Sequence, residues 1–372
     1  MTVNYTIRLL SHLGDHIDWI DDFTALDWGI AENEVGDATI TMPQSRFDFN
    51  SWQPDQIMEI WRTKDGDKQL IGKTGWLIRK WRYYEDGGES YAEINAFDAK
   101  DLLNRRIVAY PAGTVATAKN MRADDLMKEV IRENYGGTAT DTARQLSTTY
   151  FTVQANSSLA GTVSKEFSRQ NVLSLLKTVA DNAKDNGDYL VFDVERTDHG
   201  KFEFRTFFGM RGIDRSSDSD NRKIISVEAG NLANPSLTRD HTTEKNTVYC
   251  GGQGIEAERA VGTAIDTAAV GKSYWNRCED WTMNNLTDTV ATLEDTAREE
   301  TYRQKAKTIM TGNIIDSEGT RFGVDYGYGD IVSVSYLGVT VDCHIDAIIG
   351  RVRANTNGQQ QETLTTRLRG EL

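Results

Sequence analysis

Residues 330–368 read DIVSVSYLGVTVDCHIDAIIGRVRANTNGQQQETLTTRL. Residues 331–336 are predicted to form a strand. A turn at Leu337–Gly338 leads into a long strand over 339–353. A second turn at 355–358 then returns the chain into a strand over 360–368. The end of the chain is therefore predicted to be an antiparallel three-stranded meander.

The same pattern occurs near the start of the chain. A strand at 56–61 is followed by a glycine turn, a long strand over 69–84, a turn at 85–88 and a return strand over 90–97. The Glu-Asp-Gly-Gly sequence of the second turn suits a hairpin, because glycine tolerates positive φ. Identity between the two ends is low. The match indicates two similar β domains or, alternatively, two unrelated meanders of a common type.

The segment between these ends has a different character. Residues 123–135 have a helical composition and stop at two glycines, and residues 171–184 place an apolar stripe on one helical face. Strands at 189–195 and 201–208 follow. We therefore predict a mainly β chain with an α+β insertion. The predicted division is a first β domain at 1–111, an inserted α/β domain at 112–232 and a second β domain at 233–372.

A further helix is predicted near 286–307, inside the last domain. On this otherwise polar stretch four apolar residues recur at helical spacing: Leu286, Val290, Leu293 and Ala297. A narrow apolar stripe on a polar helix packs on a sheet or against a partner. We interpret these four positions as a candidate subunit interface.

The charge of the chain is unevenly distributed. Its 372 residues carry 42 Lys and Arg against 56 Asp and Glu, a formal net charge of −14. The first 60 residues hold 11 acidic side chains against two arginines, a balance of −9. This composition argues against a general nucleic-acid binder, because neutralising phosphates requires clustered cations. The acidic set is either a solvated face or a surface that repels an anion.

The cysteines and the hydropathy of the chain indicate where the protein is made and whether it enters a membrane. Cys250, Cys278 and Cys343 are an odd number at wide spacings, so they indicate neither a disulfide framework nor a C-x-x-C site, and they favour synthesis in a reducing cytoplasm. No run approaches the roughly 20 apolar residues that span a bilayer. The N-terminus lacks the features of a secretory signal. We therefore expect no stable membrane insertion.

Two short motifs resemble metal sites. His12, Asp15 and His16 lie within five positions, but Gly14 interrupts any helix that would align the two imidazoles, which favours a surface turn. The acidic, serine-rich stretch 214–221 lacks the glycine and the terminal glutamate of an EF-hand loop, which favours an exposed loop. We predict no metal-binding residue.

Catalytic and cofactor signatures are weak as well. Gly251–Gly254 lacks the third glycine of a dinucleotide-binding loop. Cys343 and His344 are adjacent on a predicted strand, so their side chains would point to opposite faces. No nucleophile elbow, zinc-protease or P-loop motif occurs. We predict no cofactor and no enzymatic activity, and the alternative of a glycosidase that uses paired carboxylates stays open.

The chain resembles the hub proteins of long-tailed phage tails, most closely the siphophage group of hub-like tail proteins. The resemblance rests on length, on the order β, α/β, β, and on residues 325–334 (DYGYGDIVSV), where a Gly-Asp step opens the last hairpin. Residues 76–103 are similar to the first barrel of the family, with a long strand, a hairpin, a return strand and a short helix. The resemblance implies two similar tube-like antiparallel β-barrels that flank the inserted α/β domain.

The resemblance also implies a structural, non-catalytic role in the virion, at a phage tail tip or baseplate. Three chains would form a homotrimer and a pseudo-six-fold ring that lets DNA pass. The ring would join the hexameric tail tube or distal tail ring to central tip, spike or fibre proteins. Many relatives continue into an enzymatic or receptor-binding module. Because this sequence stops at Leu372 after the last strand, we expect no fused activity.

If the ring encloses a DNA channel, the acidic side chains of the first 60 residues could face its lumen, where carboxylates repel DNA phosphates. The candidate lumen-facing residues are Asp15, Asp18, Asp21, Asp22, Glu32, Glu34 and Asp37. Two other functions stay open. One is a tail-associated cell-wall hydrolase that uses a carboxylate pair. The other is a carbohydrate-binding β module, suggested by eight tryptophans whose simpler role is packing.

Overall fold

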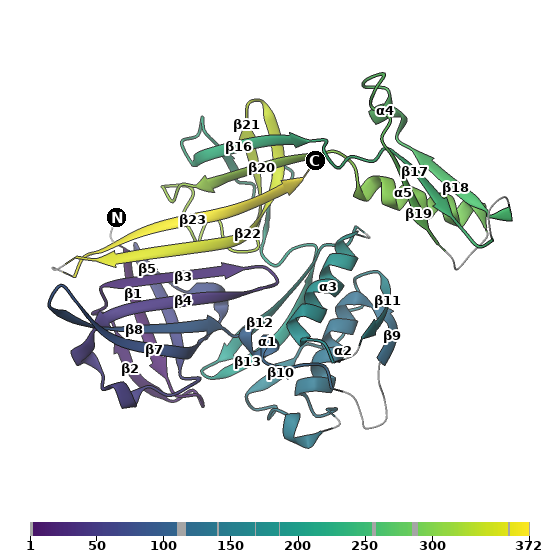
Figure 1. Ribbon diagram of the computed structural model, residues 1–372. Helices are drawn as coiled ribbons and strands as arrows, with labels where there is room; N and C mark the ends of the chain where they lie inside the picture. Colours follow the sequence, from purple (N-terminus) through teal and green to yellow (C-terminus); the bar gives the residue numbers. More distant parts are fainter. Residues whose placement is uncertain are drawn as a thin grey trace. The chain divides into compact units, whose positions relative to one another are not determined.

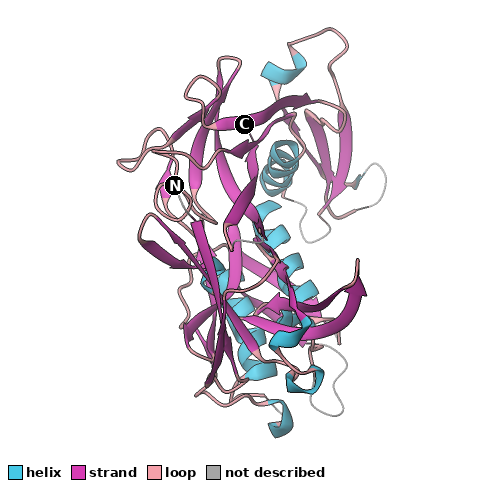
Figure 2. Cartoon of the chain, turned by 90° about the vertical axis from the view of Figure 1, so that its left-hand side faces the viewer, coloured by secondary structure: helices cyan, strands magenta, loops and turns pink. Residues whose placement is uncertain are grey.

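The computed structural model describes residues 3–109, 117–139, 141–167, 169–185, 187–254, 258–284, 289–355 and 358–371. Strands dominate its regular structure (Figures 1 and 2). The chain divides into two compact units: a large unit of Met1–Asn234 with Gly312–Leu368, and a small unit of Pro235–Thr311 with Arg369–Leu372. The boundaries of these two units differ from the predicted domain boundaries at 112 and 233. The division into three domains stays a prediction. No helix in the described ranges is long and apolar enough to cross a membrane.

An antiparallel sheet forms the N-terminal part of the large unit. Its strands are β1 (Val3–Leu10), β2 (His16–Ile20), β3 (Ala25–Ala31), β4 (Glu34–Pro43), β5 (Ile57–Lys64), β6 (Asp67–Leu70), β7 (Trp76–Asp86) and β8 (Glu89–Asp98), with short 3-10 turns η1 (Gln44–Arg46), η2 (Phe49–Ser51) and η3 (Ile71–Lys73). Neighbours pair in the order β3-β4-β8-β7-β5-β1-β2. In β1, Tyr5, Ile7 and Leu9 are buried, as the period of two predicts.

The predicted long strand over 69–84 is wrong at its start. Gln69 and Leu70 end β6, and Gly72 then adopts a φ of 69° inside η3. A positive φ takes the backbone out of the extended region, and glycine adopts it at little cost. The new strand β7 therefore begins only at Trp76.

The predicted C-terminal meander is present as β21 (Ile331–Tyr336), β22 (Val339–Ala354) and β23 (Gln360–Glu371). Strand β22 also pairs with β3, from Ala347↔Ala31 to Arg353↔Ala25. The last meander and the first sheet are therefore one continuous sheet, and the described strands contain no pairing that closes it. We expected two separate closed barrels, and the observed strand pairing instead gives one open sheet among the described strands.

Gly350 allows β22 and β3 to pair where they do. It lies opposite Trp28 in the register, and a Cβ at this position would lie 2.2 Å from Cε2 of the Trp28 indole. The Trp28 side chain is buried at this point. A larger residue at 350 would displace the indole from the core.

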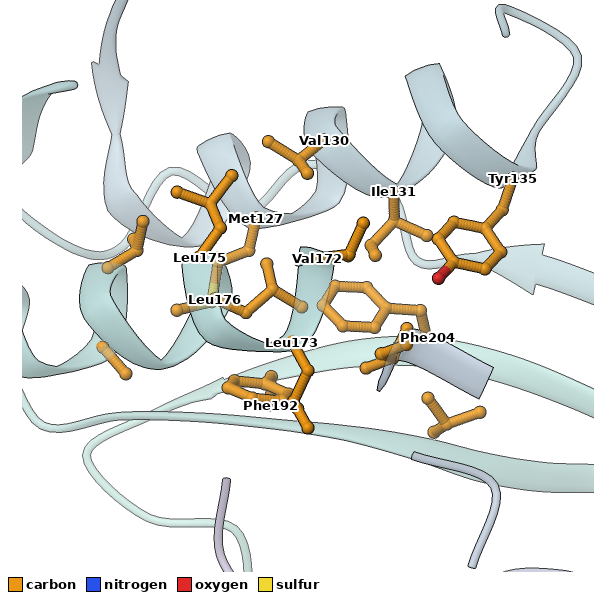
Figure 3. Close-up of a cluster of buried hydrophobic side chains, with 14 of the residues drawn as sticks. Met127, Val130, Ile131, Tyr135, Val172, Leu173, Leu175, Leu176, Phe192 and Phe204 are labelled. Atoms are coloured by element: carbon orange, nitrogen blue, oxygen red, sulfur yellow. The ribbon is translucent and has the colours of Figure 1, made fainter. Parts of the chain in front are cut away.

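The inserted segment is a mixed α/β layer, as predicted. Helix α1 (Asp101–Asn104) precedes this segment, which contains β9 (Thr117–Arg122), α2 (Ala123–Tyr135), η4 (Thr142–Arg144), β10 (Phe151–Val153), β11 (Thr162–Phe167), α3 (Val172–Asp185), β12 (Leu190–Asp198) and β13 (Lys201–Phe208). Helices α2 and α3 pack on the sheet β10-β13-β12. Figure 3 shows the core between them, where Ile131 and Leu176 of the helices meet Phe192 and Phe204 of the strands.

Two short strands follow the insertion, β14 (Asp214–Arg215) and β15 (Ile224–Ser226), and both pair in parallel with β21. Strands β16 (Leu232–Asp240) and β20 (Lys307–Ile314) run across the sequence boundary between the two units.

The small unit is a three-stranded sheet with one helix on it. Its elements are β17 (Thr247–Gly251), β18 (Val261–Ile265), α4 (Thr267–Val270), β19 (Glu279–Met283) and α5 (Val290–Arg303), with strand order β18-β17-β19. Helix α5 is shorter than predicted, since it ends at Arg303 and β20 begins at Lys307. Leu286 lies outside the described residues.

Candidate assembly site

A buried group of charged side chains lies where three distant parts of the sequence meet in the large unit. This charged junction consists of Asp98 at the end of β8, Lys100, Asp193 in β12, Arg211 after β13, and Tyr328 before β21. Lys100 Nζ lies 3.1 Å from Asp98 Oδ2 and 3.5 Å from Asp193 Oδ1. Arg211 Nε donates to Asp193 Oδ2 at 2.7 Å, and the Tyr328 ring centroid lies 4.6 Å from Arg211 Cζ. The four charged side chains are at most 4% exposed.

Burial of these charges is tolerated only because they pair. Burial alone would raise the pKa of Asp193, but Lys100 and Arg211 hold that pKa below its usual range. Burial raises the pKa of Asp98 to about 6 against the opposing attraction of Lys100, and the negative charge of Asp193 adds to the rise. Burial alone would lower the pKa of Lys100, yet the two carboxylates keep it above its usual range. The charged junction therefore ties the N-terminal sheet, the insertion and the C-terminal meander together.

Arg62 of β5 forms a second tie to the C-terminal part of the large unit. Its Nη2 lies 2.7 Å from Glu362 Oε2 and 2.8 Å from Asp316 Oδ2, and its side chain is 3% exposed. Lys64 Nζ also reaches Asp316, at 2.6 Å. Strand β5 is thus joined by ion pairs to β23 and to the segment after β20.

Glu59 holds the turn of the β12–β13 hairpin against the first sheet. This fully buried carboxylate accepts from Arg196 Nε at 2.5 Å and lies 2.8 Å from His199 Nδ1. Arg8 Nη1 lies 2.6 Å from His199 Nε2. Close beside them, a Cβ at Gly14 would lie 2.4 Å from the carbonyl oxygen of His199, so the backbones of the two turns touch there.

The two stretches that resemble metal sites in sequence form no metal site among the described side chains. His12 and His16 are exposed, and the His16 ring packs against Trp19 with ring centroids 5.7 Å apart. In the stretch 214–221, Asp214 accepts from Ser216 N, and Arg215 Nε donates to Asp330 Oδ2 at 2.8 Å. Across the described ranges, no three His, Cys, Asp or Glu side chains are arranged to hold a metal ion.

The remaining candidates for chemistry are held inside the protein. Cys343 is buried, which raises the pKa of its thiol to about 12, and His344 stacks on Tyr189 with ring centroids 4.1 Å apart. Gly251 ends β17, the central strand of the three-stranded sheet. A thiol in its neutral form is a poor nucleophile.

The acidic candidates lie mostly at the surface of the large unit. Asp15, Asp21, Asp22, Glu34 and Asp37 are exposed, and Asp18 is half-buried. Glu32 is the exception, because it is 8% exposed and accepts a hydrogen bond from Tyr189 Oη at 2.6 Å. Glu32 is therefore an interior residue of this unit, and the lumen-facing role of the other six stays a prediction.

The candidate interface residues of α5 differ in exposure. Leu293 and Ala297 are fully buried against Val248 and Cys250 of β17, in the core of the small unit. Val290 is 47% exposed. The chain's own sheet thus already covers Leu293 and Ala297, and Val290 is the described member that another subunit can reach.

Sequence patterns missed the charged junction. One signal was present, because Asp193 interrupts the apolar run Leu190–Val194, and a buried carboxylate requires a partner. Its partners, Lys100 and Arg211, are 93 and 18 residues away along the chain. Nothing local distinguishes those two cations from surface ones.

Solved structures of phage tail proteins share this fold. The tail protein from Neisseria meningitidis MC58 has a TM-score of 0.53 at 12% identity, covering 100% of this chain and 97% of that chain. The prophage tail protein gp18 from Listeria monocytogenes EGD-e has a TM-score of 0.54 at 13% identity, covering 99% and 94%. The 43 kDa tail protein of prophage MuSo2 from Shewanella oneidensis has a TM-score of 0.54 at 12% identity, covering 98% and 97%. The chain therefore has the fold of phage tail proteins.

Sequence comparison identifies the family within this class. Residues 6–364 match the family described as Siphovirus ReqiPepy6 Gp37-like protein, and the chain belongs to it. The resemblance to siphophage tail proteins is thereby confirmed. No curated protein matches the sequence.

Proposed function

We propose that the chain is a non-catalytic structural hub of a phage tail tip or baseplate, located in the virion. The observation that carries this proposal is the pairing of β22 with β3, which places the N-terminal and C-terminal meanders side by side in one sheet. Each chain then contributes two similar β elements. Three chains would present six, and a closed homotrimer of this kind can mate with a hexameric ring.

The charged junction supports this role. Its buried ion pairs join the inserted segment to the N-terminal sheet. The Tyr328 ring, packed on Arg211, adds the segment that leads into the C-terminal meander, so the junction stiffens the large unit. The partners on this proposal are the tail tube or distal tail ring on one side and central tip, spike or fibre proteins on the other.

Native mass spectrometry of the purified chain tests the proposal. We expect a species of three subunits, and imaging of the assembled tail is expected to show a ring at the tip. A strict monomer at micromolar concentration, together with no ring in the assembled particle, would contradict the hub.

The competing function is a cell-wall hydrolase. The two carboxylates whose pKa is raised most clearly, Asp98 and Glu32, are both buried and engaged by Lys100 and Tyr189. A general acid has to reach its substrate, so these groups do not favour hydrolysis. Clearing of a peptidoglycan gel by the purified chain would favour the hydrolase over the hub.

A further inference from the structure

The small unit exposes apolar side chains on one face of its sheet. Residues alternate between the two faces of a strand, and Val248 and Cys250 of β17 lie under α5 and are fully buried. The opposite face carries Trp281, Met283, Val261 and Ile265, which are 49%, 38%, 40% and 45% exposed. An exposed apolar patch rimmed by polar groups is typical of a binding surface.

Trp281 lies across the backbone of the neighbouring strand. A Cβ at Gly251 would lie 2.4 Å from Cζ2 and 2.9 Å from Cη2 of the indole, so only glycine leaves room for the ring there. The ring is nevertheless half exposed. The sheet therefore supports the indole from below and leaves part of it open to solvent as a platform.

An ordered polar group stands beside this platform. Arg277 Nε donates to Glu279 Oε1 at 2.7 Å, Arg277 Nη2 donates to the Tyr249 hydroxyl at 3.0 Å, and that hydroxyl donates to Glu279 Oε1 at 3.2 Å. Glu279 lies two residues before Trp281 on the same face, and Tyr249 is the register partner of Trp281. We call these three residues the polar fork.

The polar fork keeps hydrogen-bonding capacity for a ligand. Hydrogen bonds from Arg277 and Tyr249 lower the pKa of Glu279, so its carboxylate is an ionised acceptor. Within the described ranges, Glu279 Oε2 and Arg277 Nη1 make no hydrogen bond to the protein. An acceptor and a donor thus stand side by side at the edge of an aromatic ring.

We propose that this face binds a glycan, with a pyranose ring stacked on Trp281 and its hydroxyl groups bonded to the polar fork. A pyranose presents an apolar C–H face and a rim of hydroxyls. The first suits an aromatic platform, and adjacent hydroxyls can bond to a charged acceptor and donor at once. An apolar protein surface would instead desolvate the Arg277–Glu279 pair without replacing its water. This site goes beyond the hub role and does not depend on ring formation.

Binding of soluble hexasaccharides to the full chain tests the site. The probes are hexamers of β-1,4-linked glucose, β-1,4-linked N-acetylglucosamine and β-1,4-linked galactose, followed by isothermal titration calorimetry. We expect saturable binding of at least one hexamer. Trp281→Ala is expected to weaken it about tenfold, and Glu279→Gln by several-fold.

Trp275→Ala is the matched control, because Trp275 is 85% exposed and lies in the loop before β19, outside the strands that form the face. It is expected to bind like the unmodified chain. Glu279→Gln keeps the size of the side chain, so the variant is expected to fold. It therefore tests the proposed site even if Trp281→Ala fails to fold. No saturable binding at millimolar sugar would overturn the site, as would equal losses in the Trp275 and Trp281 variants.

Discussion

Lys100 is the only cation that reaches both Asp98 and Asp193 in the charged junction, among the ion pairs of the described residues. Lys100→Met leaves Asp98 buried without its cation, and breaking a buried pair in this way costs about 3–5 kcal/mol of unfolding free energy. Denaturant unfolding of the large unit measures the loss. Lys80→Met is the control, since Lys80 is exposed on β7 and is expected to change stability by less than about 0.5 kcal/mol.

Glu32 introduces a dependence of stability on pH. Burial raises its pKa from 4.5 to about 7, against the opposing hydrogen bond from Tyr189 and with the help of Asp346, while Arg211 and Lys100 act to lower it. The folded state therefore binds the proton more tightly than the unfolded chain. The stability from this proton is complete below about pH 4.5 and is lost as the pH rises through about 7.

Glu32→Gln removes the titrating group and keeps an acceptor for Tyr189. We expect the variant to gain stability relative to the unmodified chain between pH 5 and pH 8, by up to about 3 kcal/mol. Unfolding free energies at the two pH values give the difference. Glu34→Gln, at an exposed neighbouring position, is expected to show no such gain, and an equal gain there would contradict the role of burial.

At the scale of elements, the joint between β3 and β22 depends on Gly350. A methyl group there would meet the Trp28 indole 2.2 Å away, so Gly350→Ala is expected to lower the unfolding free energy by about 1–3 kcal/mol. Gly137→Ala is the control, because a Cβ at Gly137 meets nothing within 4 Å. Thermal unfolding compares the two variants, and equal midpoints would contradict the proposed constraint.

Helix α5 carries both a buried and an exposed apolar residue, Leu293 and Val290, so their roles can be tested separately. Leu293→Ala is expected to cost about 2–5 kcal/mol, because it removes a fully buried side chain from the core of the small unit. Hydrogen exchange should then accelerate in β17, β18 and α5. Val290→Ala, at a 47% exposed position, is expected to leave exchange unchanged. If Val290 lies at a subunit contact, its variant lowers the trimer fraction in native mass spectra instead.

At the scale of the whole molecule, the exposed acidic residues of the large unit are predicted to repel DNA that passes through the ring. Replacing Asp15, Asp21, Asp22, Glu34 and Asp37 by their amides removes five exposed negative charges. If these residues line a channel, the variant ring is expected to repel duplex DNA less than the unmodified ring at low salt. The difference is expected to vanish at high salt, where the charges are screened. Gel mobility shifts at both salt concentrations measure this.

The control for the acidic set neutralises Glu294, Asp295 and Glu299, which are exposed acids of α5 in the small unit. It is expected to leave DNA binding as weak as in the unmodified ring. The same increase in both variants would assign the acidic set to general solubility.

The sequence by itself determined the local elements and the family. Alternation along β1 and the apolar stripe of α3 specify which side of an element is buried, and that information is local. Only the tertiary structure decided which elements meet, because strand edges present the same backbone groups whatever their sequence. The pairing of β22 with β3 depends on the fit of Trp28 against Gly350, and the charged junction depends on cations far along the chain from Asp193. Such long-range complementarity leaves no periodic trace in the sequence, so it became visible only in the folded chain.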